Sequence, residues 1–133
     1  MKNFGNEYYE YYNANPHGKK TGDCVIRALA VVLGKSWETV YRDLVDIGLT
    51  YGYMINDPKC YERYLKSLGW EKYDEPRDYR NKKVQVCQFM QSIDNDVIFA
   101  RVGSRHVTAI KNHKVIDIWD CSREKMHTYW RKK

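Results

Sequence analysis

The segment at 23–34, DCVIRALAVVLG, decides the fold of this chain. Asp23 is a residue type that begins helices, and Gly34 is one that ends them. Between them the apolar residues lie nearly all around the helix instead of along one stripe, which is typical of a helix buried on every side. We therefore expect a central helix that begins at Cys24, with the rest of the chain packed around it.

Three further helices are predicted by apolar residues at helical spacing. The first two begin after the capping residues Ser36 and Asp57 and end at Gly48 and Gly69. A shorter helix is expected near residues 84–92. The remaining segments before residue 96 are expected to be extended or irregular: 8–12 (YYEYY) as an aromatic strand or a lid over the core, 13–23 as a loop, and 71–83 as a charged loop.

After residue 96 the apolar pattern changes from helical to alternating, which predicts strands. Asn112 and His113 stand where a two-residue hairpin turn needs residues that tolerate a positive φ, so that Lys111 pairs with Lys114. Helices first and a small antiparallel sheet afterwards indicate an α+β domain. The expected strands are 97–102, 106–111 and 114–119.

Length and composition favour one folded domain. The chain has 133 residues, of which 43% are hydrophobic and 14% aromatic, enough for one hydrophobic core. No apolar run approaches the ~20 residues of a membrane helix, and the N-terminus lacks the apolar stretch of a secretory signal. We therefore expect no contact with a membrane, a cytoplasmic location, and free thiols at the four cysteines.

The net charge of +6 is concentrated at the C-terminal end. The five basic residues of 123–133, against the single acidic Glu124, account for +4 of it. We therefore divide the chain into one domain at 1–122 and a basic tail at 123–133, which would dock across the site, extend the sheet or stay disordered. Nucleic-acid binding by this tail and the Tyr-rich N-terminus is the disfavoured alternative, because no recognition motif accompanies them.

Cys24 is the candidate nucleophile, because a thiol at a helix N-terminus faces unpaired N–H groups and the positive end of the dipole. A cysteine nucleophile needs a histidine base, and His106 is the one histidine that begins a predicted strand. Alternation places Thr108 and Asp117 on the same face as His106, with Asp117 diagonal to it. We expect Asp117 to orient the imidazole, and Trp119, opposite His106, to shield their hydrogen bond from water.

These motifs resemble those of the papain-like cysteine peptidases, in which a cysteine opens a buried helix and a sheet carries His, then Asn or Asp followed two residues later by Trp. The phrases GDCVIRALA and HVTAIKNHKVIDIWDC also resemble small bacterial and phage members, including the bacteriocin-leader-processing peptidases, roughly over residues 13–121. The resemblance implies a papain-like fold and a cysteine peptidase or amide hydrolase without a cofactor. Cys24 and His106 would attack a protein or peptide substrate as a thiolate–imidazolium pair, and Asp117 would orient His106.

The resemblance also implies an oxyanion hole, made by the backbone N–H of Cys24 and a side chain of the preceding loop. The family commonly has a Gln about six residues before the cysteine, but Gly18 stands there in this chain. The donor would be Asn13 or Asn15. We favour Asn15, because the following Pro16 restricts its backbone to an extended form.

Three alternatives use the same residues differently. An acyltransferase or isopeptidase would share the triad and pass the acyl group to another nucleophile. A catalytically inactive papain-like module would bind without cleaving. A zinc site would combine Cys24, His106 and Cys121 with a fourth ligand, but the paired ligand spacing typical of structural zinc is absent, so we expect no metal. The sequence carries no indication of oligomeric state.

Overall fold

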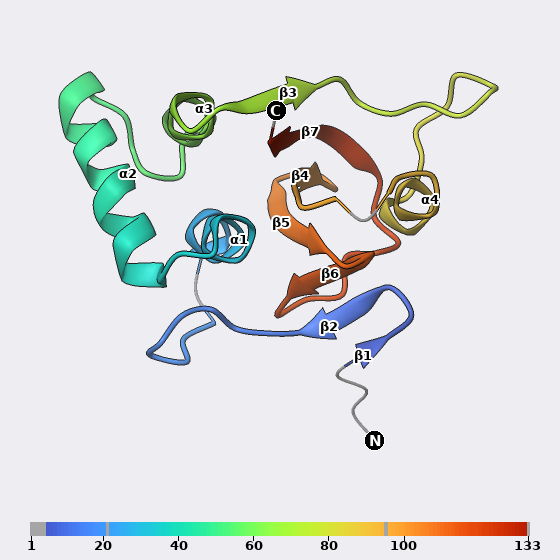
Figure 1. The fold of residues 1–133 in the computed structure, drawn as a ribbon, viewed down its shortest axis with the longest axis horizontal. Helices are drawn as coiled ribbons and strands as arrows, with labels where there is room; N and C mark the ends of the chain where they lie inside the picture. The colour runs from blue at the N-terminus through green and yellow to red at the C-terminus, as the bar shows by residue number, and fades with distance from the viewer. Residues whose placement is uncertain (1–4, 21, 95, 133) are drawn as a thin grey trace.

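The computed structural model describes residues 5–20, 22–94 and 96–132, and its helices mostly precede its strands (Figure 1). The predicted α+β class is confirmed. Within the described ranges, no helix is long and apolar enough to cross a membrane. The elements are β1 (Gly5–Asn6), β2 (Tyr9–Tyr11), α1 (Cys24–Leu33), α2 (Trp37–Tyr51), α3 (Pro58–Ser67), β3 (Trp70–Tyr73), α4 (Val86–Gln91), β4 (Ile98–Val102), β5 (His106–Lys111), β6 (Lys114–Asp117) and β7 (Met126–Lys132).

The described strands form one seven-stranded sheet in the order β1-β2-β6-β5-β4-β7-β3. Its pairings are antiparallel except for β2 with β6, which run parallel. Asn112 and His113 turn between β5 and β6 with φ of 54° and 57°, and Lys111 pairs with Lys114. The predicted hairpin and its register are therefore confirmed.

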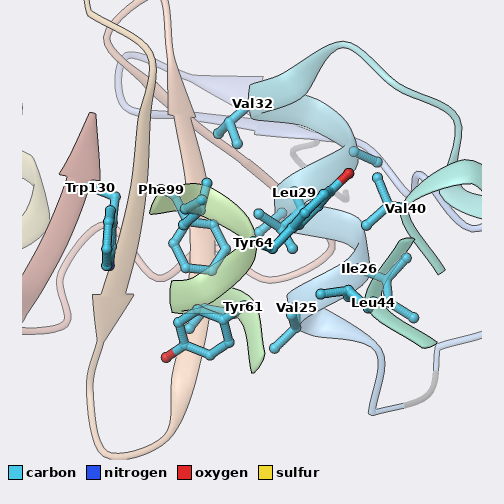
Figure 2. Packing of buried hydrophobic residues seen from close by; sticks show 14 of the residues in the cluster. Val25, Ile26, Leu29, Val32, Val40, Leu44, Tyr61, Tyr64, Phe99 and Trp130 are labelled. Atoms are coloured by element: carbon cyan, nitrogen blue, oxygen red, sulfur yellow. The ribbon is translucent and has the colours of Figure 1, made fainter. Parts of the chain in front are cut away.

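Helices cover both faces of this sheet (Figure 1). On one side α1 packs against β5, and α2 and α3 lie outside it, around a buried cluster that includes Leu29, Tyr61 and Phe99 (Figure 2). On the other side Phe89 and Met90 of α4 belong to a second buried cluster. Seven of the ten residues of α1 are buried. The central helix expected from the all-round apolar pattern is therefore present, and it begins at Cys24.

The capping residues Ser36 and Asp57 act as predicted. The side chain of Ser36 accepts a hydrogen bond from the N–H of Thr39 at 3.1 Å, and that of Asp57 accepts one from the N–H of Lys59 at 2.9 Å. Each bond satisfies a backbone donor that the helix itself leaves unpaired. The starts of α2 and α3 are thus set by local sequence.

The C-terminal segment is not the tail that its charge suggests. Residues 126–132 form β7, which lies inside the sheet between β4 and β3. Met126 is fully buried, and Trp130 is buried opposite Phe99 of β4. The net charge of the segment does not reveal these apolar side chains, which pack in the core. Of the three possibilities for the basic tail, residues 126–132 therefore follow the one in which it extends the sheet, and they belong to the folded domain instead of lying beyond it. Lys133 lies outside the described residues.

The strand β3 is a second departure from the expected elements. It occupies the beginning of the segment 71–83, which we expected to be a charged loop, and Trp70 pairs with Lys132 of β7. The run has two aromatic residues, Trp70 and Tyr73, on either side of two charged ones, and it forms a strand here because it pairs with β7 and buries Trp70.

Gly48 does not end α2, as its residue type predicted. The helix continues to Tyr51, and Gly52, with φ of 79°, ends it. A Cβ at Gly48 would lie 2.5 Å from the carbonyl oxygen of Tyr53. The N–H groups of Gly52 and Tyr53 both donate to the Gly48 carbonyl, at 2.7 and 3.0 Å, and hold the returning chain against the helix. Glycine at this position therefore permits a close backbone approach.

We expect Gly48→Ala to lower the free energy of unfolding by about 1–3 kcal/mol, the usual range for overpacking. In an open helix interior the same substitution raises the free energy of unfolding by about 1 kcal/mol. The nearby Tyr53 carbonyl reverses the sign of this effect. Urea denaturation measures the difference. Asp46→Ala, at an exposed position of α2, is the control and should be neutral or slightly stabilising. A Gly48→Ala protein as stable as the wild type would contradict the close approach.

Candidate active site

Cys24 lies at the start of α1 beside the start of β5, and its side chain is half-buried. Burial raises the pKa of the Cys24 thiol. Hydrogen bonds with the His106 side chain and the Val107 backbone, and the positive charges of His106 and Arg27, outweigh burial and lower this pKa below its ordinary value. The structure thus brings the predicted nucleophile and the predicted base together and stabilises the thiolate.

His106 is held by Asp117. Its Nε2 lies 2.6 Å from Asp117 Oδ2. Burial lowers the pKa of the His106 imidazole, but hydrogen bonds with Asp117, Cys121 and Cys24 and the charge of Asp117 raise it well above its ordinary value. The opposite shifts of the thiol and the imidazole favour a thiolate beside an imidazolium.

The carboxylate of Asp117 accepts hydrogen bonds at both oxygens. Oδ1 accepts from Arg27 Nη1 at 2.8 Å and from the N–H of Ile118 at 2.7 Å. Oδ2 accepts from Thr108 Oγ1 and from His106 Nε2, both at 2.6 Å. Burial raises the pKa of Asp117, but the bonds from His106 and Thr108, with the charges of His106 and Arg27, bring it below the ordinary value. An ionised carboxylate only accepts hydrogen bonds, so His106 Nε2 carries the proton.

Trp119 contacts His106, although not in the way predicted. The N–H of Ile118 donates to the side chain of Asp117, and β6 ends at Asp117 instead of continuing to residue 119. Trp119 therefore lies beyond the strand and does not pair with His106 within the ladder. Its ring meets the imidazole edge-on, with centroids 5.0 Å apart, and is 44% exposed. Its shielding role stays a prediction.

Asn15 lies next to the site, tied to the residue that precedes Cys24. Its Nδ2 donates to Asp23 Oδ2 at 3.1 Å, and its Oδ1 accepts from the N–H of His17 at 2.8 Å. The other candidate, Asn13, donates instead to the carbonyl of Lys19. The oxyanion role of Asn15 therefore stays a prediction.

Asp23 stands at the N-cap position of α1, but its side chain makes no capping hydrogen bond. Oδ1 accepts from Arg27 Nε at 2.9 Å, and Oδ2 accepts from Trp37 Nε1 at 2.8 Å as well as from Asn15. The expected cap is thus wrong in its contacts, because three side-chain donors occupy the carboxylate.

Arg27 belongs to the site, and the sequence did not lead us to expect it there. It is 7% exposed and joins Asp23 to Asp117. The available signal was its residue type, since it is the only charged residue in 24–33, a helix that is otherwise apolar. Cys121, named above only in the zinc alternative, is fully buried and also interacts with His106.

Three of these side chains offer atoms that a metal ion binds. Ligand atoms of His106, Asp117 and Cys121 lie within 4.8 Å of one another, among the residues described. Cys24, which the zinc alternative required, is not in this group. Both oxygens of Asp117 already accept hydrogen bonds from protein donors, among them Arg27. A metal would therefore have to displace bonds that the protein makes on its own.

The arrangement is suited to attack on an acyl carbon, because it joins a stabilised thiolate, a proton donor and a carboxylate that fixes the donor's ring. No family model, curated protein or solved structure matches the chain. The geometry of Cys24, His106 and Asp117 is therefore what indicates a function.

Proposed function

We propose that this protein is a cysteine peptidase or amide hydrolase with a papain-like fold, in which Cys24 is the nucleophile, His106 the acid and base, and Asp117 the orienting group. The observation that carries the proposal is an imidazole whose Nε2 is held at 2.6 Å by a buried carboxylate. This imidazole lies close enough to Cys24, at the start of α1, to lower the pKa of its thiol. Acyl transfer through a thioester requires a nucleophile next to a base whose ring is held by a third group.

In the proposed reaction the Cys24 thiolate attacks the carbonyl carbon of an amide. The carbonyl oxygen takes up the negative charge, and N–H groups in the first turn of α1 are suited to stabilise it. The His106 imidazolium gives its proton to the leaving nitrogen as the C–N bond breaks, which leaves a thioester on Cys24. His106 then takes a proton from water, the hydroxide displaces the thiolate, and the carboxylic acid product leaves.

The proposed substrate is a peptide or protein, and the proposed setting is the reducing cytoplasm. A cavity near the start of α1 supports the substrate part of this proposal. It measures about 440 Å³, and its walls include Asp23 and Val25, the two neighbours of Cys24 in the chain. Trp37, Tyr41 and Ile55 give it an apolar lining. Such a lining favours an apolar side chain of the substrate.

Reaction with p-nitrophenyl acetate tests the proposal. We expect a burst of about one nitrophenolate per protein molecule, an acetyl group on Cys24 by mass spectrometry, and slower turnover as water releases acetate. Cys24→Ala should abolish the burst. Cys87→Ala is the matched control, because Cys87 is also half-buried but hydrogen-bonds to Gln85 on α4's side of the sheet, and it should behave as the wild type.

The outcome also separates the alternatives. Acetyl-Cys24 that is stable in water but released by an added amine would indicate an acyltransferase or isopeptidase. A Cys24 that is acetylated no faster than Cys87 would contradict catalysis and favour a binding module of the same fold.

A further inference from the structure

We propose that Arg27 is a positioning residue of this site, which holds the Asp117 carboxylate in the orientation in which that carboxylate holds His106. The inference rests on the proposed function of Cys24, His106 and Asp117. It adds a residue that does not touch the reacting atoms and acts through Asp117.

The guanidinium of Arg27 connects the helix of the nucleophile to the strand of the orienting group. Arg27 lies one turn after Cys24 on α1, and its Nη1 donates to Asp117 Oδ1 on β6 at 2.8 Å. A guanidinium is planar and presents its N–H groups in a rigid fork. Because α1 carries both Cys24 and Arg27, this bond sets the place of Asp117 relative to the nucleophile, and Asp117 in turn sets the place of His106.

Arg27 is itself held from the other side. Its Nε donates to Asp23 Oδ1 at 2.9 Å. Asp23 accepts further bonds from Trp37 Nε1 at the start of α2 and from Asn15 Nδ2 in the preceding loop. Both carboxylates and Arg27 are buried, with 4% to 7% of their surface exposed. Four segments of the chain thus converge to fix one guanidinium.

Sharing Arg27 between two carboxylates also preserves the effect of Asp117 on His106. A buried Arg paired with Asp117 alone would neutralise it and weaken its attraction for the imidazolium. Asp23, Arg27 and Asp117 together carry one formal negative charge, which favours a protonated His106 beside them. Asp23 therefore lets Arg27 orient Asp117 without cancelling its charge.

The test is the pH dependence of Cys24 alkylation by iodoacetamide from pH 5 to 9, followed by mass spectrometry. Arg27→Lys keeps the charge and loses the fork, so it cannot hold Asp23 and Asp117 in the same geometry. In Arg27→Lys we expect the pH at which the alkylation rate rises to increase by half a unit or more. This shift corresponds to about threefold slower alkylation at pH 6. Arg27→Met should shift this pH further upward. Arg42→Met is the matched control, because Arg42 is exposed and pairs with Glu38 on the surface of α2. It should leave the profile unchanged.

Thermal unfolding by circular dichroism is measured on the same samples. If Arg27→Met fails to fold, because it leaves two buried carboxylates without a cation, Arg27→Lys decides. A folded Arg27→Lys protein with the wild-type profile would overturn the inference, since charge alone would then suffice. If Cys24 of the wild type itself reacts as an ordinary thiol at pH 6, the proposed function fails and the inference fails with it. If Cys24 is reactive at pH 6 in the wild type and the Arg27→Lys protein has the same pH profile, the proposed function is retained. Only the positioning role of Arg27 is then contradicted.

Discussion

His106→Ala is expected to slow alkylation of Cys24 by iodoacetamide at pH 6 by at least about tenfold. In the wild type the hydrogen bond with His106 is the largest cause that lowers the Cys24 pKa against burial, followed by the Val107 backbone and the charge of His106. Without His106 only Val107 and Arg27 oppose burial, so the pKa rises and the thiolate fraction at pH 6 falls. The rate in the variant should then rise about tenfold for each pH unit below that raised pKa, whereas the wild type should already react at pH 6.

The assay needs a control in which a histidine changes without altering the site. His113 lies in the β5–β6 turn with a positive φ of 57° and hydrogen-bonds to the carbonyl of Ile93. His113→Asn keeps a residue type that tolerates this backbone and should alkylate as the wild type does. Equal rates at pH 6 for His106→Ala and the wild type would contradict the thiolate–imidazolium pair, and with it the proposed function.

The largest effect on stability is expected at Leu29. This side chain of α1 is fully buried in the cluster that also contains Tyr64 and Phe99 (Figure 2). Leu29→Ala removes apolar contacts and leaves a cavity that tightly packed neighbours cannot fill, at a cost of about 2–5 kcal/mol in the free energy of unfolding. Urea denaturation at constant temperature measures this loss.

Leu49→Ala provides the matched comparison, because Leu49 is 80% exposed on α2. It should change stability by no more than about 0.5 kcal/mol. A loss below about 1 kcal/mol for Leu29→Ala would show that α1 is not packed as a central helix. The folded fraction of Leu29→Ala should keep its low-pH alkylation of Cys24, since Leu29 is not among the residues whose hydrogen bonds or charges lower the pKa of Cys24.

Local sequence was sufficient where short-range chemistry decides the structure. The all-round apolar pattern after Asp23 predicted α1 and put Cys24 at its start. The positive φ required by the two-residue turn at 112–113 set the β5–β6 register, and through the alternation of side chains this register brought Asp117 to His106. These features depend on backbone geometry over a few residues, which residue type records directly.

Local sequence failed where the partner was distant in the chain. The basic residues of 123–133 do not indicate that β7 pairs with β4 on one side and β3 on the other. Likewise, Gly48 does not indicate that the Tyr53 carbonyl packs against it. Asp23 has the residue type of a cap, yet its carboxylate is occupied by Arg27, Trp37 and Asn15.

The sequence by itself thus determined the α+β class, the central helix and the pairing of His106 with Asp117. Only the tertiary structure decided that Cys24 lies near enough to His106 for its pKa to fall, and that Arg27 joins Asp23 to Asp117 inside the protein. The physical reason is that hairpin pairing and helix capping act over a few residues. Packing of α1 on the sheet, and the burial of a charge beside two carboxylates, depend on segments that meet only after the chain has folded.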